Sequence, residues 1–240
     1  MKLLINKIKE KKSLKNLDDE IVKDTIRKYL DGNVDLTNPK SASFKDVLKQ
    51  TRNELNRIYG CFMTGDELDL KSHSSTRERL LLYPTLYKDI FKITGKPKSI
   101  LDISAGFNPL SYKYLTCKPK YLATELTKID TTNLNKWFKQ NKILGKAIQK
   151  NITKDTNFPK TDITFIFKTL DLLNYKLAEE IITNLKSEYA IISFSTKTLN
   201  NIQMRHPHRG WLERMLERLK IQYTKLEYPN EIFYIINLSK

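Results

Sequence analysis

Cysteine, histidine and glycine are scarce in this chain, whose 240 residues include 2 Cys, 3 His and 7 Gly. Cys61 and Cys117 form no CxxC pair and no zinc-type spacing, which argues against a disulfide framework and a structural metal. No apolar run reaches the about 18–20 residues of a membrane span, and lysines interrupt the apolar residues at the amino end. These absences predict a cytoplasmic protein that is neither secreted nor embedded in a membrane.

Negative charge is also scarce compared with positive charge. The chain has 43 Lys and Arg residues against 27 Asp and Glu residues, a net charge of +16. An excess of this size favours a polyanionic partner, because each neutralised phosphate releases a counterion. Nucleic acid is the first candidate, and the alternative is a lysine-rich surface that only maintains solubility. The 40% of hydrophobic residues is enough for a globular protein with a sizeable core.

The first 95 residues show helical spacing and no strand pattern. Apolar residues three and four apart predict one amphipathic helix over residues 14–30, which ends at a turn of residues 31–33. A second helix is expected after Pro39, with Ser43 as its cap. We therefore expect residues 1–95 to form a helical amino-terminal region.

From residue 96 onward, short β-branched runs alternate with helical stretches, which is the pattern of an α/β protein. The first five runs are continuously apolar, as in a parallel sheet covered on both faces. The last two flank a short turn and predict a closing hairpin. We expect residues 96–240 to form one α/β domain with a seven-stranded, mostly parallel sheet. The runs are 99–103, 121–124, 147–152, 163–167, 189–194, 222–226 and 232–237.

An acidic residue and a loop of small residues end the first predicted strand. Asp102 closes the strand, and the loop after it contains Ala105, Gly106 and Asn108. Ligands of open α/β sheets bind beyond the carboxyl ends of the strands, where small residues let the backbone approach a bound molecule closely. The alternative is an ordinary strand-to-helix turn. A single glycine falls short of a GxGxxG motif, which disfavours an NAD site.

Polar residues also end the next two predicted strands. Glu125 can accept hydrogen bonds from both hydroxyls of a ribose. Asn151, followed by Ile152, can read the edge of an adenine, because a carboxamide both donates and accepts. The carboxyl ends of parallel strands meet at one edge of a sheet, so these residues predict an adenosine pocket. The alternatives are a solvated acid and a turn asparagine.

The segment HSSTRER at residues 73–79 is the most specific motif of the chain. It resembles the His-x-Ser-Thr-Arg-Glu-Arg signature of the 16S rRNA guanine-N7 methyltransferases that confer aminoglycoside (antibiotic) resistance. The resemblance continues in the same order through LDISAGFNPL at 101–110, FKTLDLL at 167–173 and ISFSTKTL at 192–199. It implies S-adenosylmethionine as cofactor and a class I (Rossmann-like) methyltransferase domain preceded by a helical region.

The same resemblance implies roles for single residues. Arg77 would hold the methionine carboxylate of the cofactor, a task that suits a forked guanidinium. The alternative is that Arg77 and Arg79 only belong to the start of a helix. Asp102 and Glu125 would face the amino group and the ribose. The chain differs from the family in Ala105, where Cys is usual, and in Glu125, where Asp is usual.

Lys168 follows the fourth predicted strand, where class I methyltransferases place the residues that meet the target base. A lysine at the end of a buried strand is costly unless it reaches a cleft, so we expect it to contact a phosphate or the guanine O6. Guanine N7 carries a free lone pair, and its methylation therefore needs alignment more than a general base. The resemblance makes Lys168 the expected catalytic residue.

Basic and aromatic residues follow the fifth predicted strand. Lys197, Arg205 and Arg209 suit RNA phosphates, and Trp211 suits stacking on a base. The alternative for Trp211 is the buried face of the next helix. Together with the amino-terminal helices, this basic face is expected to dock structured RNA.

The motifs and the charge together predict a methyltransferase that uses S-adenosylmethionine to form 7-methylguanosine in the decoding region of small-subunit (16S) rRNA. The expected partner is the small ribosomal subunit or its 16S rRNA, and the expected state is a monomer. The alternatives are a tRNA guanine methyltransferase, methylation at adenine N1, an RNA-binding relative without catalysis, and a nucleotide-dependent oxidoreductase.

Overall fold

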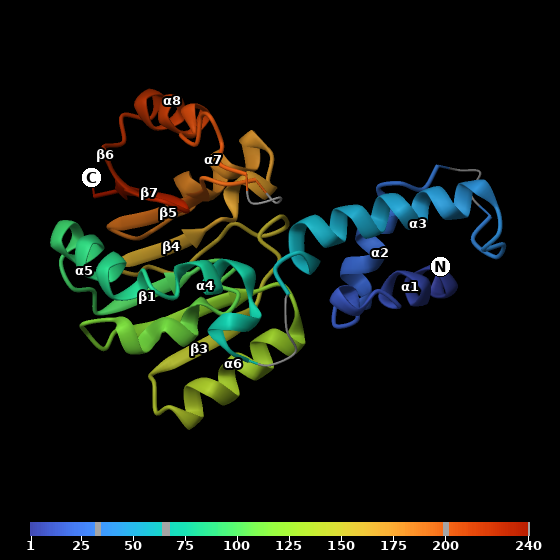
Figure 1. The fold of residues 1–240 in the computed structure, drawn as a ribbon, viewed down its shortest axis with the longest axis horizontal. Helices are drawn as coiled ribbons and strands as arrows, with labels where there is room; N and C mark the ends of the chain where they lie inside the picture. Colours follow the sequence, from blue (N-terminus) through green and yellow to red (C-terminus); the bar gives the residue numbers. More distant parts are fainter. Residues whose placement is uncertain (32–34, 64–67, 199–201, 240) are drawn as a thin grey trace.

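The computed structural model describes residues 1–31, 35–63, 68–198 and 202–239 (Figure 1). A group of amino-terminal helices stands beside a twisted sheet that carries helices on both faces. The amino terminus lies in the helical group, and the carboxyl terminus lies at the edge of the sheet far from it (Figure 1).

The amino-terminal helices are α1 (Lys2–Lys9), α2 (Asp19–Arg27) and α3 (Ala42–Leu55). A π-helical turn, η2 (Asn56–Gly60), continues α3 toward the sheet. The three helices bury their apolar faces against one another, because none of them is long enough to be stable alone in water. This shared core contains Leu4, Ile8, Val22, Ile26, Phe44 and Leu55.

The helix expected over residues 14–30 is shorter than the sequence predicts. Its first part is a separate 3-10 turn, Lys12–Leu14, and α2 begins only at Asp19. Asp18 before it is extended, with φ −66° and ψ 141°, so the helical register is interrupted there. Apolar spacing continues across such an interruption, which is why the pattern predicts one helix. The predicted turn at 31–33 lies partly outside the described residues, since Gly32 and Asn33 are not among them.

The start of α3 differs from the prediction by two residues. Ser41 is the cap in place of Ser43, because the backbone N–H of Phe44 donates to the Ser41 hydroxyl at 3.2 Å. Ser43 lies within the first helical turn, with its oxygen 3.4 Å from that of Ser41. Two serines of equal capping propensity stand near this boundary, and the spacing alone does not separate them.

The seven strands form one sheet in the order β3-β2-β1-β4-β5-β7-β6. Strands β1 to β5 pair in parallel, and β7 runs antiparallel to β5 and β6, so the predicted class I, Rossmann-like α/β sheet is confirmed. The order changes direction between β1 and β4, which is where such sheets bind their ligands. The strands are β1 Ser99–Asp102, β2 Lys120–Glu125, β3 Gly145–Gln149, β4 Ile163–Phe167, β5 Tyr189–Ser195, β6 Tyr223–Tyr228 and β7 Glu231–Asn237.

Two hydrophobic cores cover the two faces of the sheet. Along β4, Phe165 belongs to the first core and its neighbour Ile166 to the second, which explains the continuous apolar run. The first core contains α5 and α6, and the second contains α7 and α8. Helix α5, which the prediction groups with residues 1–95, therefore packs against the sheet. These helices are α5 Tyr83–Thr94, α6 Lys128–Gln140, α7 Tyr175–Asn184 and α8 Gly210–Arg218.

Polar contacts join the amino-terminal helices to the carboxyl ends of the strands. The guanidinium of Arg57 donates to the carbonyl of Leu172 at 3.1 Å, and the hydroxyl of Tyr59 donates to the carboxylate of Asp130 at 2.9 Å. The helical group is thus fixed over the edge of the sheet at which ligands bind.

Within the described ranges, no helix combines the length and the apolar character that crossing a membrane requires.

Candidate active site

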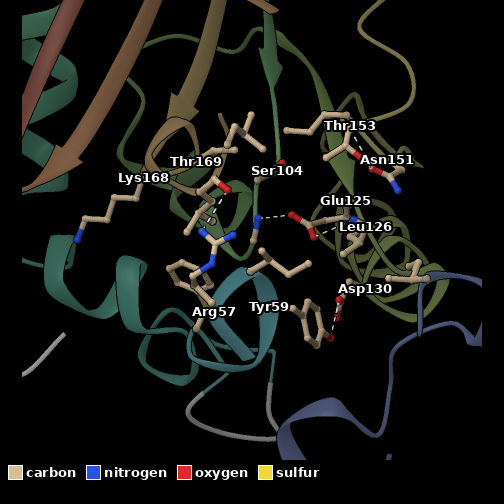
Figure 2. Close-up of a pocket in the computed structure, with 18 of the residues that line it drawn as sticks. Arg57, Tyr59, Ser104, Glu125, Leu126, Asp130, Asn151, Thr153, Lys168 and Thr169 are labelled. Atoms are coloured by element: carbon tan, nitrogen blue, oxygen red, sulfur yellow. Dashed lines mark hydrogen bonds between the residues drawn. The ribbon is translucent and has the colours of Figure 1, made fainter. Parts of the chain in front are cut away.

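A cavity of about 630 Å³ opens between the carboxyl ends of the strands and the amino-terminal helices (Figure 2). The segments that follow β1, β2, β3 and β4 line one side, and residues of α2 and η2 line the other. Two parts of the chain that are distant in sequence therefore build one site. The predicted site residues in this lining are Ala105, Gly106, Glu125, Asn151, Ile152 and Lys168.

The loop after β1 has a conformation that requires small residues. Ser104 and Gly106 have positive φ angles of 52° and 54°. A Cβ at Gly106 would lie 2.7 Å from Nε2 of His73, well inside van der Waals contact. The N–H of Gly106 donates to the carboxylate of Glu125. The glycine thus brings the loop backbone against the end of β2.

The ring of His73 closes this side of the cavity. It stacks on Phe62 with ring centroids 5.6 Å apart, and it lies against Phe107 at 5.4 Å. Burial, together with the positive charges of Arg79 and Lys168, lowers the pKa of His73 to about 3. The imidazole is therefore neutral near pH 7 and acts here as a wall of the cavity.

Glu125 ends β2 with its carboxylate buried and directed into the cavity (Figure 2). Its two oxygens accept hydrogen bonds from the backbone N–H groups of Gly106 and Leu126, the latter at 3.2 Å. Burial, with a smaller contribution from the nearby Asp130, raises the pKa of Glu125 to about 8. A carboxylate at this position is held in place to accept hydrogen bonds from a ligand.

Asp102 lies beneath the same loop at the end of β1, 1% exposed and outside the cavity lining, which includes the neighbouring Ser104. Its Oδ2 accepts hydrogen bonds from the Tyr121 hydroxyl at 2.5 Å and from Nδ2 of Asn108 at 2.9 Å. Its Oδ1 is buried and has no partner. Burial raises the pKa of Asp102 to about 6. An unpartnered buried carboxylate oxygen is costly, and a bound ammonium group would satisfy it.

Asn108 has a different position from the one expected of a cofactor-binding residue. Its side chain is 1% exposed and lies outside the lining of the cavity. Its amide group donates to Asp102, and its oxygen accepts hydrogen bonds from Arg79 at 3.2 Å and from Tyr83 at 2.9 Å. Asn108 therefore positions Asp102 from behind and makes no contact with the cavity.

Asn151 and Ile152 line the far end of the cavity, beyond the end of β3 at Gln149. The oxygen of Asn151 accepts hydrogen bonds from the backbone N–H and the hydroxyl of Thr153, at 3.0 and 2.7 Å. These bonds are typical of a turn asparagine, which is the alternative role of Asn151. With its oxygen used in this way, the side chain keeps its NH₂ group as a donor for a ligand.

The structure separates the two arginines of the HSSTRER segment. Arg77 is exposed and lies outside the cavity lining, so the structure does not bring it to the predicted position. Arg79 is 2% exposed and belongs to the lining. Its guanidinium bonds to Glu231 at 2.9 Å and lies 4.8 Å above the Phe167 ring. Helix α4 (Ser74–Arg79) turns these positions to different sides, since residues two apart in a helix do not share a face.

Lys168 follows β4 at the edge of the cavity and has a positive φ of 55°. Its side chain is 10% exposed. Its Nζ contacts the carboxylate of Glu78 and lies 3.6 Å from that of Glu231. The two carboxylates compensate the positive charge, which is the condition for keeping a lysine in this position.

The basic residues after β5 lie apart from the cavity lining. Lys197 is half-buried and Arg205 is exposed, as a surface that contacts RNA requires. Arg209 is different, because its guanidinium bonds to Asp171 at 2.7 Å and stacks 5.0 Å above the Phe194 ring. These contacts give Arg209 a structural role in place of the predicted phosphate contact.

Trp211 also packs inward. Its ring lies edge-on to Phe194 with centroids 5.9 Å apart and to Tyr175 at 6.1 Å, at the margin of the second core. The packing agrees with the buried-face alternative for this residue.

Among the residues that the structure describes, no group of His, Cys, Asp and Glu side chains is placed to hold a metal ion.

Three residues of the site have no counterpart in the sequence-based prediction. Arg57 and Tyr59 line the cavity from η2, and the buried Glu231 at the start of β7 bonds to Arg79. Their contacts join segments far apart in the chain, and no local spacing points to them. An acidic residue in the turn just before the last predicted strand is the only visible signal for Glu231.

Comparison with known proteins finds a matching family and similar sequences and structures. A family model described as "Ribosomal RNA methyltransferase (FmrO)" matches residues 62–235. The chain is 23% identical to a 16S rRNA (guanine(1405)-N(7))-methyltransferase of Micromonospora echinospora, over 80% of this chain and 82% of that protein. It is 27% identical to a protein of the same name from Proteus mirabilis, over 70% and 63%. The crystal structure of 16S rRNA methyltransferase RmtF in complex with S-adenosyl-L-homocysteine is similar, with a TM-score of 0.78, 18% identity and coverage of 98% and 97%.

Proposed function

The chain belongs to the FmrO family of ribosomal RNA methyltransferases, and from that premise we propose that it methylates N7 of a guanine in 16S rRNA with S-adenosylmethionine as methyl donor. The observation that carries the proposal is the pair of buried carboxylates at the ends of β1 and β2, beside a loop in which Gly106 has no room for a side chain. The names of the relatives supply the base and the ring nitrogen.

Residues of the cavity lining, together with Asp102 directly beneath it, fit the cofactor part by part. The unpartnered Oδ1 of Asp102 would accept a hydrogen bond from the ammonium of the methionine portion. The carboxylate of Glu125 would accept both ribose hydroxyls, and the NH₂ group of Asn151 would donate to a ring nitrogen of adenine. When bound, S-adenosylmethionine supplies an electrophilic methyl group on a sulfonium. The protein holds this group and excludes water from it.

The other side of the cavity suits the base. We assign Lys168 to the target guanine, where its ammonium would donate to O6 and align N7. N7 already carries a lone pair, so no side chain has to remove a proton before transfer. The neutral His73 and the two aromatic rings against it give the cavity a wall that holds no additional charge.

Identification of the product tests this proposal. The protein is incubated with labelled S-adenosylmethionine and either small ribosomal subunits or total tRNA, and the RNA is digested and analysed by mass. We expect 7-methylguanosine in 16S rRNA. A variant with Asp102→Ala and Glu125→Ala serves as the control for contaminating activity. Label in tRNA alone, or a different methylated nucleoside, would contradict the proposal.

Since ribosomes are the proposed substrate, we place the protein in the cytoplasm.

We also propose that residues 1–95 provide the RNA-docking part and residues 96–240 the catalytic part. Lys45 and Lys49 lie on the exposed side of α3, one helical turn apart, where phosphates can reach both of them. Affinity for small subunits should therefore fall steeply as the salt concentration rises. Replacing both lysines with Gln should reduce the slope of log K against log[salt] by about 2, because each phosphate contact contributes about 1.

Filter binding at several salt concentrations measures this slope. The matched control replaces Lys136 and Lys139, two exposed lysines of α6, with Gln. We expect the control to keep the slope of the unmodified protein. Equal slopes for both variants would argue against docking through α3.

Cofactor affinity should depend on pH through Glu125. The carboxylate is the form that accepts two ribose hydroxyls, and burial raises its pKa to about 8 in the cofactor-free protein. Affinity for S-adenosylmethionine is therefore expected to rise by about tenfold per pH unit below pH 8 and to level off above it. Conversely, the cofactor-free protein should lose stability as the pH rises from 4.5, the ordinary pKa of a glutamate, through about 8.

Calorimetric titrations between about pH 6.5 and 9 measure the dependence on pH. Glu125→Gln should bind more weakly and with a flat profile, since its amide does not ionise in this range. A sloping profile in Glu125→Gln would show that another group, such as Asp102 or Asp130, controls the titration.

A further inference from the structure

A continuous series of buried polar contacts connects the base side of the cavity to the cofactor side. The Nζ of Lys168 lies 3.6 Å from Glu231, and Glu231 accepts hydrogen bonds from Nε of Arg79 at 2.9 and 3.1 Å. Arg79 donates through Nη1 to the oxygen of Asn108 at 3.2 Å. Asn108 in turn donates to Asp102 at 2.9 Å. The residues assigned to the base and to the methionine portion are thus joined through the protein interior.

Glu231 also supports the backbone of Lys168 through Ser193. The N–H of Lys168 donates to the carbonyl of Ser193 at 3.0 Å and to its hydroxyl at 3.2 Å. That hydroxyl donates to the carboxylate of Glu231. The backbone of Lys168 has a φ of 55°, a conformation that a lysine keeps only when its surroundings impose it. One carboxylate therefore constrains both the backbone and the ammonium of Lys168.

The two carboxylates near Lys168 differ in burial and in the contacts that hold them. Glu78 is 43% exposed on α4, so water or a substrate group can replace it. Glu231 is 1% exposed and fixed by Arg79 and Ser193. We therefore expect Glu231 to keep its position when RNA enters the cavity, and to hold the ammonium of Lys168 in place.

Stability alone is a weak reason for burying Glu231 with Arg79. The desolvation cost of a buried ion pair often equals or exceeds its Coulombic attraction, and apolar replacements are frequently tolerated. The Arg79–Glu231 pair lies between Lys168 on one side and Asn108 with Asp102 on the other, so it is placed to fix the distance between Lys168 and Asp102.

We propose that Glu231 is a positioning residue for Lys168, and that the series Glu231, Arg79, Asn108 and Asp102 fixes the spacing between the target base and the methionine end of the cofactor. The inference rests on the proposed function and deepens it. Glu231 touches neither the base nor the cofactor, and it acts through Lys168.

Glu231→Gln is the first test, because the amide keeps the size of the side chain and removes its charge. With small subunits as substrate, we expect the single-turnover rate of methyl transfer to fall by roughly 10-fold to 100-fold, and the affinity for S-adenosylmethionine to stay within about threefold. Glu227→Gln, an exposed carboxylate on the neighbouring strand β6, is the matched control and should transfer at the unmodified rate.

A double-mutant cycle with Lys168→Ala separates positioning from general damage. If Glu231 acts through Lys168, adding Glu231→Gln to Lys168→Ala should lower the rate by less than about twofold further. A purely structural role would instead lower both rates by the same factor, and that result would overturn the proposal. Because Glu231→Gln leaves Arg79 without its counter-charge, a neutral pair, Arg79→Gln with Glu231→Gln, is measured in parallel. It should lose at least as much rate, since Arg79 belongs to the same series. Recovery of the rate in the neutral pair would assign the loss to the unpaired charge of Arg79 and overturn the proposal.

A readout independent of activity is the chemical labelling of Lys168. Reductive methylation followed by mass spectrometry should modify Lys168 roughly 10-fold faster in Glu231→Gln, because one charged contact that holds the ammonium is lost. Lys154, which pairs with Asp24, should keep its rate. An unchanged labelling rate at Lys168 would overturn the inference. Faster labelling in a protein that transfers no methyl group to 16S rRNA would support the positioning role and reject the proposed function.

Discussion

Replacing both Asp102 and Glu125 with alanine is expected to abolish measurable binding of S-adenosylmethionine. Each carboxylate would make charge-assisted hydrogen bonds to the cofactor, worth about 1.5–3 kcal/mol apiece, so the two losses amount to about 3–6 kcal/mol. That corresponds to a rise in Kd of roughly 10² to 10⁴, which calorimetry detects as the disappearance of binding heat.

The double variant should nevertheless fold. Both carboxylates are buried with raised pKa values, about 6 for Asp102 and about 8 for Glu125, so their ionised forms do not favour the folded cofactor-free protein near pH 7.5. The thermal midpoint of the cofactor-free variant checks this expectation. Asp46→Ala combined with Glu217→Ala, an exposed aspartate and glutamate outside the cavity, is the matched control. A double variant at 102 and 125 that binds within about tenfold of the unmodified protein would contradict the pocket assignment.

The sheet and the cofactor end of the site could be predicted because their signals are local. Buried parallel strands read as apolar runs, and acidic residues at their ends stand out against those runs. Since the carboxyl ends of parallel strands meet, Glu125 and Asn151 could be placed in one pocket without a structure. Gly106 is also a local signal, because a positive φ favours glycine, whereas its close approach to His73 is visible only in the structure.

Lys168 at the base side follows from its place after a buried strand, but the contacts of the charged residues around the site could not be predicted in the same way. Arg79 and Glu231 are 152 residues apart in the chain, and their pairing depends on where α4 meets the start of β7. The choice between Arg77 and Arg79 depends on the rotation of a helix about its axis, which six residues do not specify. The sequence predicts a phosphate contact for Arg209 because its partner Asp171 lies on a different segment. Each of these differences comes from tertiary contacts, which the spacing of residues along the sequence does not reveal.

Replacing Lys168 is expected to stop methyl transfer while cofactor binding continues. If the ammonium aligns guanine O6, its loss lets the base shift from the line of attack, which costs about 10²-fold or more in single-turnover rate. S-adenosylmethionine should bind within about twofold of the unmodified affinity, because Lys168 lies at the base side of the cavity.

Two substitutions distinguish the side chain of Lys168 from its strained backbone. At a φ of 55°, alanine retains the backbone strain and glycine relieves it, so Lys168→Gly should be about 1 kcal/mol more stable than Lys168→Ala in thermal unfolding. Both variants should lose transfer equally if the ammonium carries the function. If Lys168→Gly kept most of the rate, the backbone of this turn would be the functional element. A parallel loss of cofactor affinity in both variants would instead move Lys168 to the cofactor side. Lys168 lies between Glu78 on the open side and Glu231 on the buried side. Equal loss of methyl transfer in both variants, with unchanged cofactor binding, would therefore assign alignment of the base to the ammonium of Lys168.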